Sequence, residues 1–368
     1  MYRIPLIKPF VTEEVLAKVR SVLESGHLTE GPVAREFEKT IGAKVGAAHC
    51  LAVSSCTTGL EMALRALGVG PGDEVIVPDY TYPATASVVN IVGAGCVIVD
   101  VDPATMLIDY DALEAAITPR TKAAIPVSLF GNPLDWGRLA DIKQRTGIFL
   151  VEDAACALGS SYKGVMTGAL ADISVFSHHP RKFITTGEGG TITTENDLWA
   201  EWMASYKHFG LRGNASRLGS DFFRIGTNYK LSDVLAGIGV AQLKHMDELL
   251  TERRALASFY RELFSGDAKI GLPEITQQGE HSWQTLCVYV EERDRVMEQM
   301  RAEGIEVQIG TYALSMHPAF NDNPACRLEG GLAGSRYAFG HALALPLFHG
   351  MTRAEQTEVA QTLRKMVG

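Results

Sequence analysis

Residues 74–99, EVIVPDYTYPATASVVNIVGAGCVIV, contain a strand–helix–strand pattern that decides the fold class. Glu74 to Pro78 reads as a short buried strand, and the stretch from Asp79 to Pro83 reads as a turn. A helix then continues to about Ile91, and a second apolar strand covers Cys96 to Val99. Two short apolar strands joined by a helix predict a parallel pair of strands that helices cover on both faces.

The same alternation continues on both sides of this segment. A strand at Cys50 to Val53 leads into a helix, and strands at Ala123 to Val127 and Phe149 to Glu152 flank a helix from Trp136 to Thr146. The sequence therefore predicts an α/β protein whose large domain has three layers, with a mostly parallel sheet between helices. A long helix is expected from Ser232 to about Phe264, and a smaller C-terminal α+β domain follows it.

Composition and charge exclude several classes of protein. The chain has 368 residues, of which 46% are hydrophobic and 21% charged, and these values exclude wholesale disorder and a small disulfide-stapled fold. A net charge of −9 argues against a nucleic-acid or membrane partner. No segment approaches the ~18 uninterrupted apolar residues of a membrane helix. The six cysteines contain no CxxC motif, so we expect reduced thiols and a cytoplasmic protein.

Two features near the carboxyl ends of the predicted strands remain ambiguous by themselves. The small residues from Ser54 to Thr58 begin a helix, where free backbone N–H groups could bind a phosphate. They are also ordinary N-cap residues. The ring of Tyr82 could stack on a planar ligand at the ligand-binding edge of the sheet, or it could pack locally in the loop.

Two charged side chains are stronger candidates. Asp153 ends an apolar strand, where a carboxylate is costly without a cation, a metal or several N–H donors, although a helix-capping role is an alternative. Lys182 lies in HHPRKFITTGEGG (178–190), and burial among apolar residues can lower the pKa of a lysine and make it a nucleophile that forms a Schiff base. The adjacent His178 and His179 would point to opposite faces of an extended strand, so we expect no metal site.

A phosphate cradle, a stacking aromatic ring, a carboxylate and a lysine are together the parts needed to hold pyridoxal 5′-phosphate. The carboxylate keeps the ring nitrogen protonated, the lysine holds the aldehyde, and the helix N-terminus takes the phosphate.

The chain resembles the DegT/DnrJ/StrS-type sugar aminotransferases over nearly its whole length. The resemblance rests on GHLTEGPVAREFE (26–38), SSCTTGLEMAL (54–64), PDYTYPATASVV (78–89), VEDAACALGSSYKG (151–164), FSHHPRKFITTGEGG (176–190), GTNYKLSDVLAGIGVAQLKHMDELLTERR (226–254) and LALPLFHGMT (343–352). It implies the fold of aspartate aminotransferase (PLP-dependent transferase fold type I). It also implies an N-terminal arm and large cofactor-binding domain at 1–245, and a small C-terminal domain at 246–368.

The resemblance assigns roles to single residues around the cofactor ring. It implies that Lys182 is the Schiff-base lysine and that Asp153 is the partner of the ring nitrogen. Tyr82 would stack on the ring. Cys156 occupies the position near the phenolic oxygen where the family usually has His or Gln, and we expect this thiol to alter the tuning of the cofactor.

The resemblance also assigns residues to the phosphate group. The backbone amides of Cys56 and Thr57 and the hydroxyl of Ser177 would bind it within one chain. Asn228 would reach the phosphate of a neighbouring subunit, which implies a homodimer with shared active sites. None of these groups is basic, so an acidic chain can still bind an anionic cofactor.

The activity that the resemblance implies is transfer of an amino group from glutamate or glutamine to a ketosugar, with pyridoxamine 5′-phosphate as the intermediate form of the cofactor. The acceptor is expected to be a nucleotide-linked 3- or 4-keto sugar. The segment from Thr311 to Pro318 departs from the family's common HYxPxH-like pattern, so the particular sugar and the carbon that is aminated stay open. His178 replaces a phenylalanine of the family pattern.

Three other classes of protein are alternatives. A non-catalytic regulator with the same fold would not need both Lys182 and Asp153. A sugar dehydratase of the same family would carry histidine in place of Lys182. A nicotinamide-dependent oxidoreductase would carry a GxGxxG motif after its first strand, and the chain has SSCTTG there.

Overall fold

The strand–helix–strand pattern of residues 74–99 forms as predicted in the computed structural model, which describes residues 2–211 and 221–368. Strand β2 (Glu74–Pro78), helix α4 (Ala84–Ile91) and strand β4 (Gly95–Val99) follow one another. β2 and β4 pair in parallel, with Ile76 opposite Val97.

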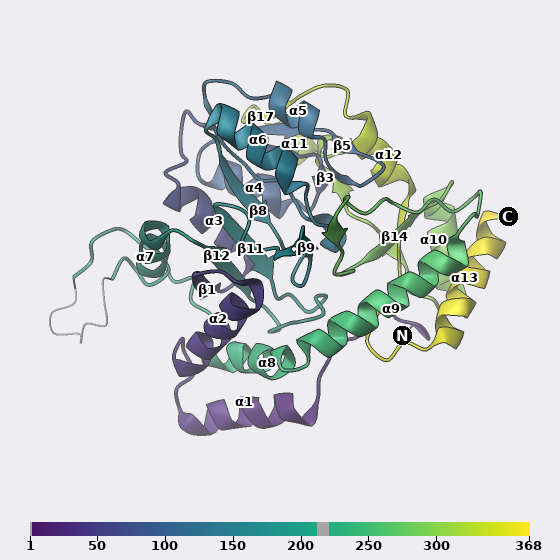
Figure 1. The fold of residues 1–368 in the computed structure, drawn as a ribbon, viewed down its shortest axis with the longest axis horizontal. Coiled ribbons are helices and arrows are strands. Elements are labelled where there is room, and N and C mark those ends of the chain that lie inside the picture. Colours follow the sequence, from purple (N-terminus) through teal and green to yellow (C-terminus); the bar gives the residue numbers. More distant parts are fainter. Residues whose placement is uncertain (1, 212–220) are drawn as a thin grey trace.

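The other helices and strands alternate along the chain (Figure 1). The other α-helices are α1 (Glu13–Ser25), α2 (Pro32–Val45), α3 (Cys56–Ala66), α5 (Tyr110–Ala115), α6 (Trp136–Thr146), α7 (Asp197–Tyr206), α8 (Asp233–Leu243), α9 (Met246–Phe264), α10 (Arg293–Ala302), α11 (Pro318–Asn321), α12 (Ala333–His341) and α13 (Arg353–Val367). The other strands are β1 (His49–Val53), β3 (Tyr80–Thr81), β5 (Val101–Asp102), β6 (Leu107–Ile108), β7 (Thr121–Ala124), β8 (Phe149–Asp153), β9 (Ser161–Tyr162), β10 (Val165–Met166), β11 (Ile173–Ser177), β12 (Gly190–Thr194), β13 (Gly279–Glu280), β14 (Leu286–Tyr289), β15 (Gln308–Ile309), β16 (Tyr312–Ala313), β17 (Cys326–Leu328) and β18 (Ala342–Leu345).

The main sheet of the described residues has the strand order β1-β12-β11-β8-β7-β2-β4-β17. From β11 to β17 every neighbouring pair is parallel. Only β12 runs antiparallel, to both β11 and β1. A mostly parallel sheet, as predicted, places the carboxyl ends of β2, β8 and β11 at one edge, where α/β proteins bind ligands.

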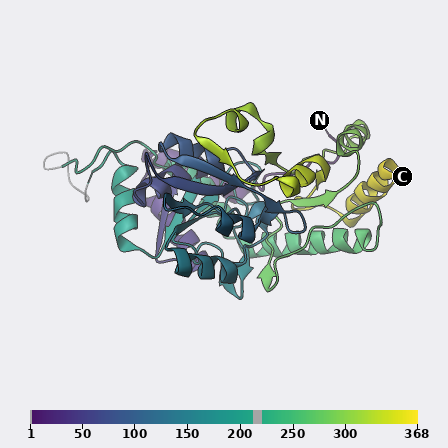
Figure 2. The ribbon, with the colours of Figure 1, turned by 90° about the horizontal axis from the view of Figure 1, so that it is seen from above.

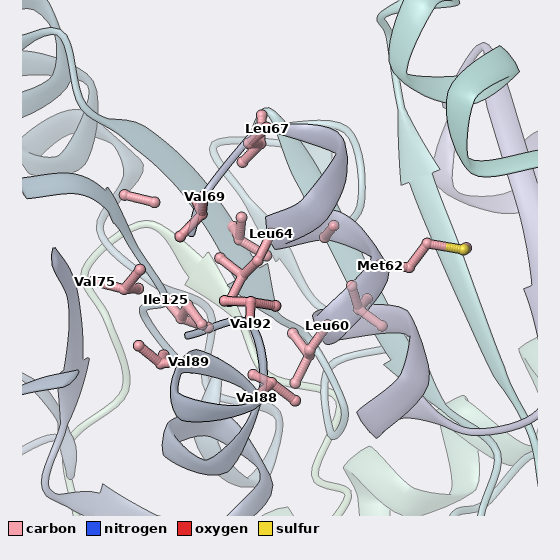
Figure 3. Close-up of a cluster of buried hydrophobic side chains, with 14 of the residues drawn as sticks. Leu60, Met62, Leu64, Leu67, Val69, Val75, Val88, Val89, Val92 and Ile125 are labelled. Carbon is pink, nitrogen blue, oxygen red and sulfur yellow. The ribbon is translucent and has the colours of Figure 1, made fainter. Parts of the chain in front are cut away.

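Alternating side chains of β2 anchor helices on the two faces of this sheet, because successive residues of a strand point in opposite directions. Val75 packs into one buried cluster with Leu64 of α3 and Val88 of α4 (Figure 3). Ile76 packs into another cluster on the opposite face, together with Leu139 of α6. Each such side chain contributes about 1.5–3 kcal/mol when fully buried, so both helical layers are firmly held.

The C-terminal part forms a second sheet, β14-β18-β15, which is antiparallel throughout. It shares a buried cluster with α9, α10 and α13, and these elements lie together at the end of the molecule opposite α7 (Figures 1 and 2). Two segments connect this part to the rest. Ile4 from the N-terminal arm is buried in its core, and β17 returns to pair with β4 at the edge of the main sheet.

The single helix expected from Ser232 to about Phe264 is two helices, so this expectation was wrong. α8 ends at Leu243 and α9 begins at Met246, with His245 in a non-helical conformation between them. Neither proline nor glycine marks the break. α8 buries its surface against α1 and α2, whereas α9 buries Leu256 and Tyr260 in the C-terminal cluster. The predicted domain boundary at residue 245 falls at this break and stays a prediction. Within the described ranges, no helix combines the length and the apolar character needed to cross a bilayer.

Candidate active site

Asp153 lies at the carboxyl end of β8 and is 4% exposed. Its Oδ2 accepts a hydrogen bond of 2.7 Å from the Thr85 hydroxyl, and its Oδ1 accepts one of 3.1 Å from the Ala155 N–H group. Burial raises the pKa of this carboxyl group, and these two hydrogen bonds and the charge of Lys182 oppose the rise. Among the described residues, the hydrogen bonds to its two oxygens come from Thr85 and Ala155, and Lys182 acts on it as a nearby charge. The site therefore holds a buried carboxylate that lacks a direct cationic partner.

Thr85 is a site residue that the sequence analysis missed. It lies in the first turn of α4 and is fully buried, and its N–H group donates to the Tyr82 carbonyl at 3.2 Å. Thr85 thus connects the Tyr82 turn to Asp153. A threonine three residues after a tyrosine has no distinctive pattern in a sequence, and only the pairing of strands brings it to Asp153.

The backbone around Lys182 is held by Gln284, which the sequence analysis also missed. The Gln284 Oε1 accepts a hydrogen bond of 3.1 Å from the Phe183 N–H, and its Nε2 donates one of 2.8 Å to the Arg181 carbonyl. Gln284 is buried, and its two hydrogen bonds hold the residues on both sides of the lysine. It precedes β14 in the C-terminal part, so no local signal could have linked it to the lysine.

The side chain of Lys182 is half-buried, and its Nζ donates to the Cys156 Sγ at 3.0 Å. Burial lowers the pKa of this amine, but Cys156, Cys56 and Asp153 raise it more, so the net pKa lies above the usual value. Burial alone would lower the pKa of this amine, which is the direction expected from the sequence. That direction was wrong, because acidic side chains from two segments, Cys56 on one and Asp153 and Cys156 on the other, raise the pKa more than burial lowers it.

The N-terminus of α3 lies beside these residues. Ser55 caps the helix, and its hydroxyl accepts from the Thr58 N–H at 3.1 Å. The N–H groups of Cys56 and Thr57 come first in the helix, where no carbonyl of the preceding turn is available to them. A Cβ added to Gly190 would lie 2.7 Å from the Cys56 nitrogen, so the start of β12 closes tightly against this helix end.

Ser177 ends β11, two residues beyond the position where Val175 pairs with Asp153, and it is thus on the same edge of the sheet. Its hydroxyl accepts from the His179 N–H at 3.3 Å. The structure therefore gathers Cys56, Ser177, Asp153 and Lys182 at one edge of the sheet.

Tyr82 and Asn228 are placed differently. Tyr82 is 66% exposed, and its ring centroid lies 6.3 Å from that of Tyr312. Asn228 is exposed, and its Oδ1 accepts from the Lys230 Nζ at 2.6 Å. The carbonyl of the next residue, Tyr229, accepts a hydrogen bond of 2.8 Å from the Ser54 N–H, which keeps Asn228 and Tyr229 near the start of α3. No contact joins the Asn228 side chain to Lys182 or Asp153 among the described residues.

Two buried titratable side chains flank the site. Glu152 is fully buried and points away from Asp153, accepting hydrogen bonds from Ser128 (2.5 Å) and Ser174 (2.9 Å). His178 packs edge-on against Phe37 with a centroid distance of 5.0 Å, and burial lowers its pKa to about 4. The described residues contain no cluster of three His, Cys, Asp or Glu side chains that could hold a metal.

These residues fit pyridoxal phosphate. The buried Asp153 carboxylate lacks a direct cation, which a protonated ring nitrogen would supply. The start of α3 offers free N–H groups to a phosphate, and the Lys182 amine is close enough to both Cys56 and Asp153 for their charges to raise its pKa. The Tyr82 ring is exposed at this edge of the sheet, so a planar ligand can reach it.

Known proteins define the family to which this chain belongs. Residues 9–364 match the sequence profile of the DegT/DnrJ/EryC1/StrS aminotransferase family. The spore coat polysaccharide biosynthesis protein SpsC of Bacillus subtilis (strain 168) is 33% identical, over 99% of this chain and 97% of that protein.

Solved structures agree with this match. The putative sugar aminotransferase Spr1654 of Streptococcus pneumoniae, in its PMP form, has a TM-score of 0.93 at 30% identity and covers 99% of both chains. DesV of S. venezuelae, in complex with a ketimine intermediate, has a TM-score of 0.92 at 31% identity and covers 99% of this chain and 98% of that one.

The chain is thus a member of the DegT/DnrJ/EryC1/StrS aminotransferase family. The predictions of the family, the α/β fold and the aminotransferase class are confirmed. The roles of the individual site residues stay predictions that the geometry now makes specific.

Proposed function

We propose that this protein transfers an amino group from glutamate or glutamine to a ketosugar, and that the acceptor is a nucleotide-linked 3- or 4-keto sugar. Membership of the aminotransferase family supports the reaction, and the names of SpsC and Spr1654 support a sugar acceptor. The observation that carries the proposal is the half-buried Lys182 amine beside the buried Asp153 carboxylate at one edge of the sheet.

Pyridoxal phosphate is the cofactor, in keeping with the PLP and PMP forms of Spr1654. When bound, it supplies an electron-withdrawing ring and an aldehyde carbon that carries the amino group from donor to acceptor. Asp153 holds a proton at the ring nitrogen, and the amides of Cys56 and Thr57 with the hydroxyl of Ser177 bind the phosphate.

Lys182 does the proton transfers. Its amine takes a proton from the α-carbon of the donor, and it later gives a proton to the sugar carbon that receives the amino group. Gln284 keeps the amine in place for both steps, because it fixes the backbone on either side. The Tyr82 ring covers the ligand from the exposed side.

A lysine variant tests the proposal. Lys182→Ala should abolish the absorbance band, near the border of the visible and ultraviolet, of the cofactor covalently joined to the lysine, and also the formation of keto acid from glutamate. Lys39→Ala, which removes an exposed lysine of α2, should retain both and serves as the matched control. Turnover in Lys182→Ala close to that of the parent protein would overturn the proposal.

A substrate panel tests the acceptor. Nucleotide-linked 3-keto and 4-keto sugars should accept the amino group, whereas the same sugars without a nucleotide should react poorly. Parallel assays with glutamate and glutamine identify the donor. Equal activity on free ketosugars would contradict the nucleotide-linked assignment while leaving the aminotransferase assignment intact.

We also propose that two copies of the chain share their active sites through Asn228. The segment around it exposes apolar side chains, with Phe222 at 67% and Ile225 at 94%, which a second copy could cover. Light scattering should give a dimer. Mixing Lys182→Ala with Asn228→Ala chains should restore part of the activity, because one site of each mixed dimer would be intact. No recovery on mixing in dissociating and reassociating conditions would contradict shared sites.

A further inference from the structure

The closest contact of the Lys182 amine is a thiol, and both groups are fixed by independent parts of the chain. The Nζ–Sγ distance to Cys156 is 3.0 Å. Cys156 lies in the turn after β8, where its carbonyl accepts from the Ser282 hydroxyl at 3.2 Å. Lys182 is fixed by Gln284. The two side chains are each half-buried, so a small oxidant can reach them.

We propose that Cys156 and Lys182 form a covalent sulfur–nitrogen cross-link when the protein meets a hydroperoxide in the absence of bound cofactor. A cysteine that oxidises to a sulfenic acid can condense with a nearby nitrogen. Here the nitrogen is already within hydrogen-bonding distance of the sulfur, which gives the condensation a large advantage over attack by a thiol from solution.

The step balances in two stages. The Cys156 thiol gives two electrons to hydrogen peroxide, whose O–O bond breaks, and the products are the sulfenic acid and one water. Lys182 then releases one proton to water, because its raised pKa keeps the amine protonated. The freed nitrogen lone pair attacks the sulfur and the S–O bond breaks. The leaving hydroxide takes the proton that nitrogen loses, and a second water forms. The protein has lost two hydrogen atoms and gained one S–N bond.

Cys56 is the competing thiol, because it also lies close enough to Lys182 to affect its charge. Its Sγ donates to the Val175 carbonyl at 3.8 Å, and burial raises the pKa of this thiol well above the usual value. Cys56 is half-buried, as Cys156 is, but a thiol with a raised pKa forms little thiolate, which is the form that reacts with peroxide. The structure therefore favours Cys156 as the thiol that is oxidised.

The cross-link would occupy the amine that holds the cofactor, so bound cofactor and cross-link exclude each other. This consequence rests on the proposed function, whereas the cross-link itself does not. The cross-link would form when the amine of Lys182 is free, and it would not form when the cofactor engages that amine.

Mass spectrometry of the full-length protein tests the proposal. The protein, freed of cofactor, is treated with hydrogen peroxide and measured without reductant. We expect an intact mass lower by two hydrogen atoms, and a tryptic digest in which the peptide containing Cys156 is joined to the one beginning at Lys182. Dithiothreitol should restore the original mass. Protein loaded with pyridoxal phosphate before treatment should show little cross-link.

Two cysteine variants identify the sulfur, and neither readout depends on activity. Cys156→Ser should abolish the cross-link, and Cys56→Ser should retain it. A disulfide joining the peptides of Cys56 and Cys156 would overturn the proposal, as would oxygen addition to Cys156 without any joined peptide. Equal cross-linking with and without pyridoxal phosphate would overturn the claim of protection. The proposed transfer reaction would be unaffected by any of these outcomes.

Discussion

Replacing Glu152 with glutamine should make the protein more stable at alkaline pH. Glu152 lies on β8 next to Asp153 and is fully buried, with hydrogen bonds from the hydroxyl groups of Ser128 and Ser174. Burial raises its pKa to about 7, and these hydrogen bonds reduce the rise. Glutamine has the same shape and carries no charge; its amide oxygen can accept from one of the two serine hydroxyls, and its NH2 group can donate to the other.

The magnitude follows from linkage between protonation and folding. The unfolded carboxyl group titrates at its ordinary value of 4.5, whereas the folded one titrates at about 7. Between these values the folded chain binds a proton that the unfolded chain has released, so stability falls as pH rises through this window. A gap of about 2.5 units at ~1.36 kcal/mol each gives about 3 kcal/mol lost by pH 8.

Urea unfolding at fixed protein concentration measures this effect at about pH 5 and pH 8. Glu152→Gln should stay within ~1 kcal/mol of the parent at pH 5, where both carry a neutral group, and exceed it by up to about 3 kcal/mol at pH 8. Glu24→Gln, which removes an exposed carboxylate of α1, controls for net charge. A difference between Glu152→Gln and the parent that is the same at both pH values would refute the reasoning.

Two further predictions concern the packing behind the site. Because burial lowers the pKa of His178 to about 4, its folded form resists protonation and the parent loses stability as pH falls from 6.5 towards 4. His178→Phe should show a smaller loss over that range in urea unfolding, and an equal loss would contradict this. A Cβ on Gly239 would lie 2.4 Å from the Phe37 ring, so Gly239→Ala should lower stability by ~1–3 kcal/mol. Gly340→Ala, where a Cβ meets nothing within 4 Å, should not lower Tm, and equal shifts for both would count against steric overlap as the cause.

The fold could be predicted because its signal is local. Short apolar strands that alternate with helices require a covered parallel sheet, and β2, α4 and β4 form where the sequence placed them. The break between α8 and α9 could not be predicted, because helix propensity continues through Lys244 and His245. It arises from burial of the two helices against different partners.

Candidate site residues could be predicted from the sequence where a charged side chain lies in a segment whose burial would cost free energy. A carboxylate ending a buried strand and a lysine in a glycine-rich segment identified Asp153 and Lys182. Thr85 and Gln284 were missed, because each matters only through a contact with a residue 68 or about 100 positions away. The direction of the Lys182 pKa depends on the same kind of contact, since Cys56 approaches the amine from one segment and Asp153 and Cys156 approach it from another.

The hydrogen bonds between Gln284 and the residues on either side of Lys182 also determine when the lysine becomes fixed during synthesis of the chain. Lys182 is synthesised 102 residues before Gln284. Likewise, Ile4 can pair with Ile305 only after nearly all of the chain has been made. Contacts this distant in sequence form late, because a long loop must close before they add any stability. A nascent chain that has produced all of β1 to β12 therefore still lacks a fixed lysine. We expect the capacity to hold the cofactor to appear only after the C-terminal part has emerged, which ties the first competent active site to a nearly complete chain.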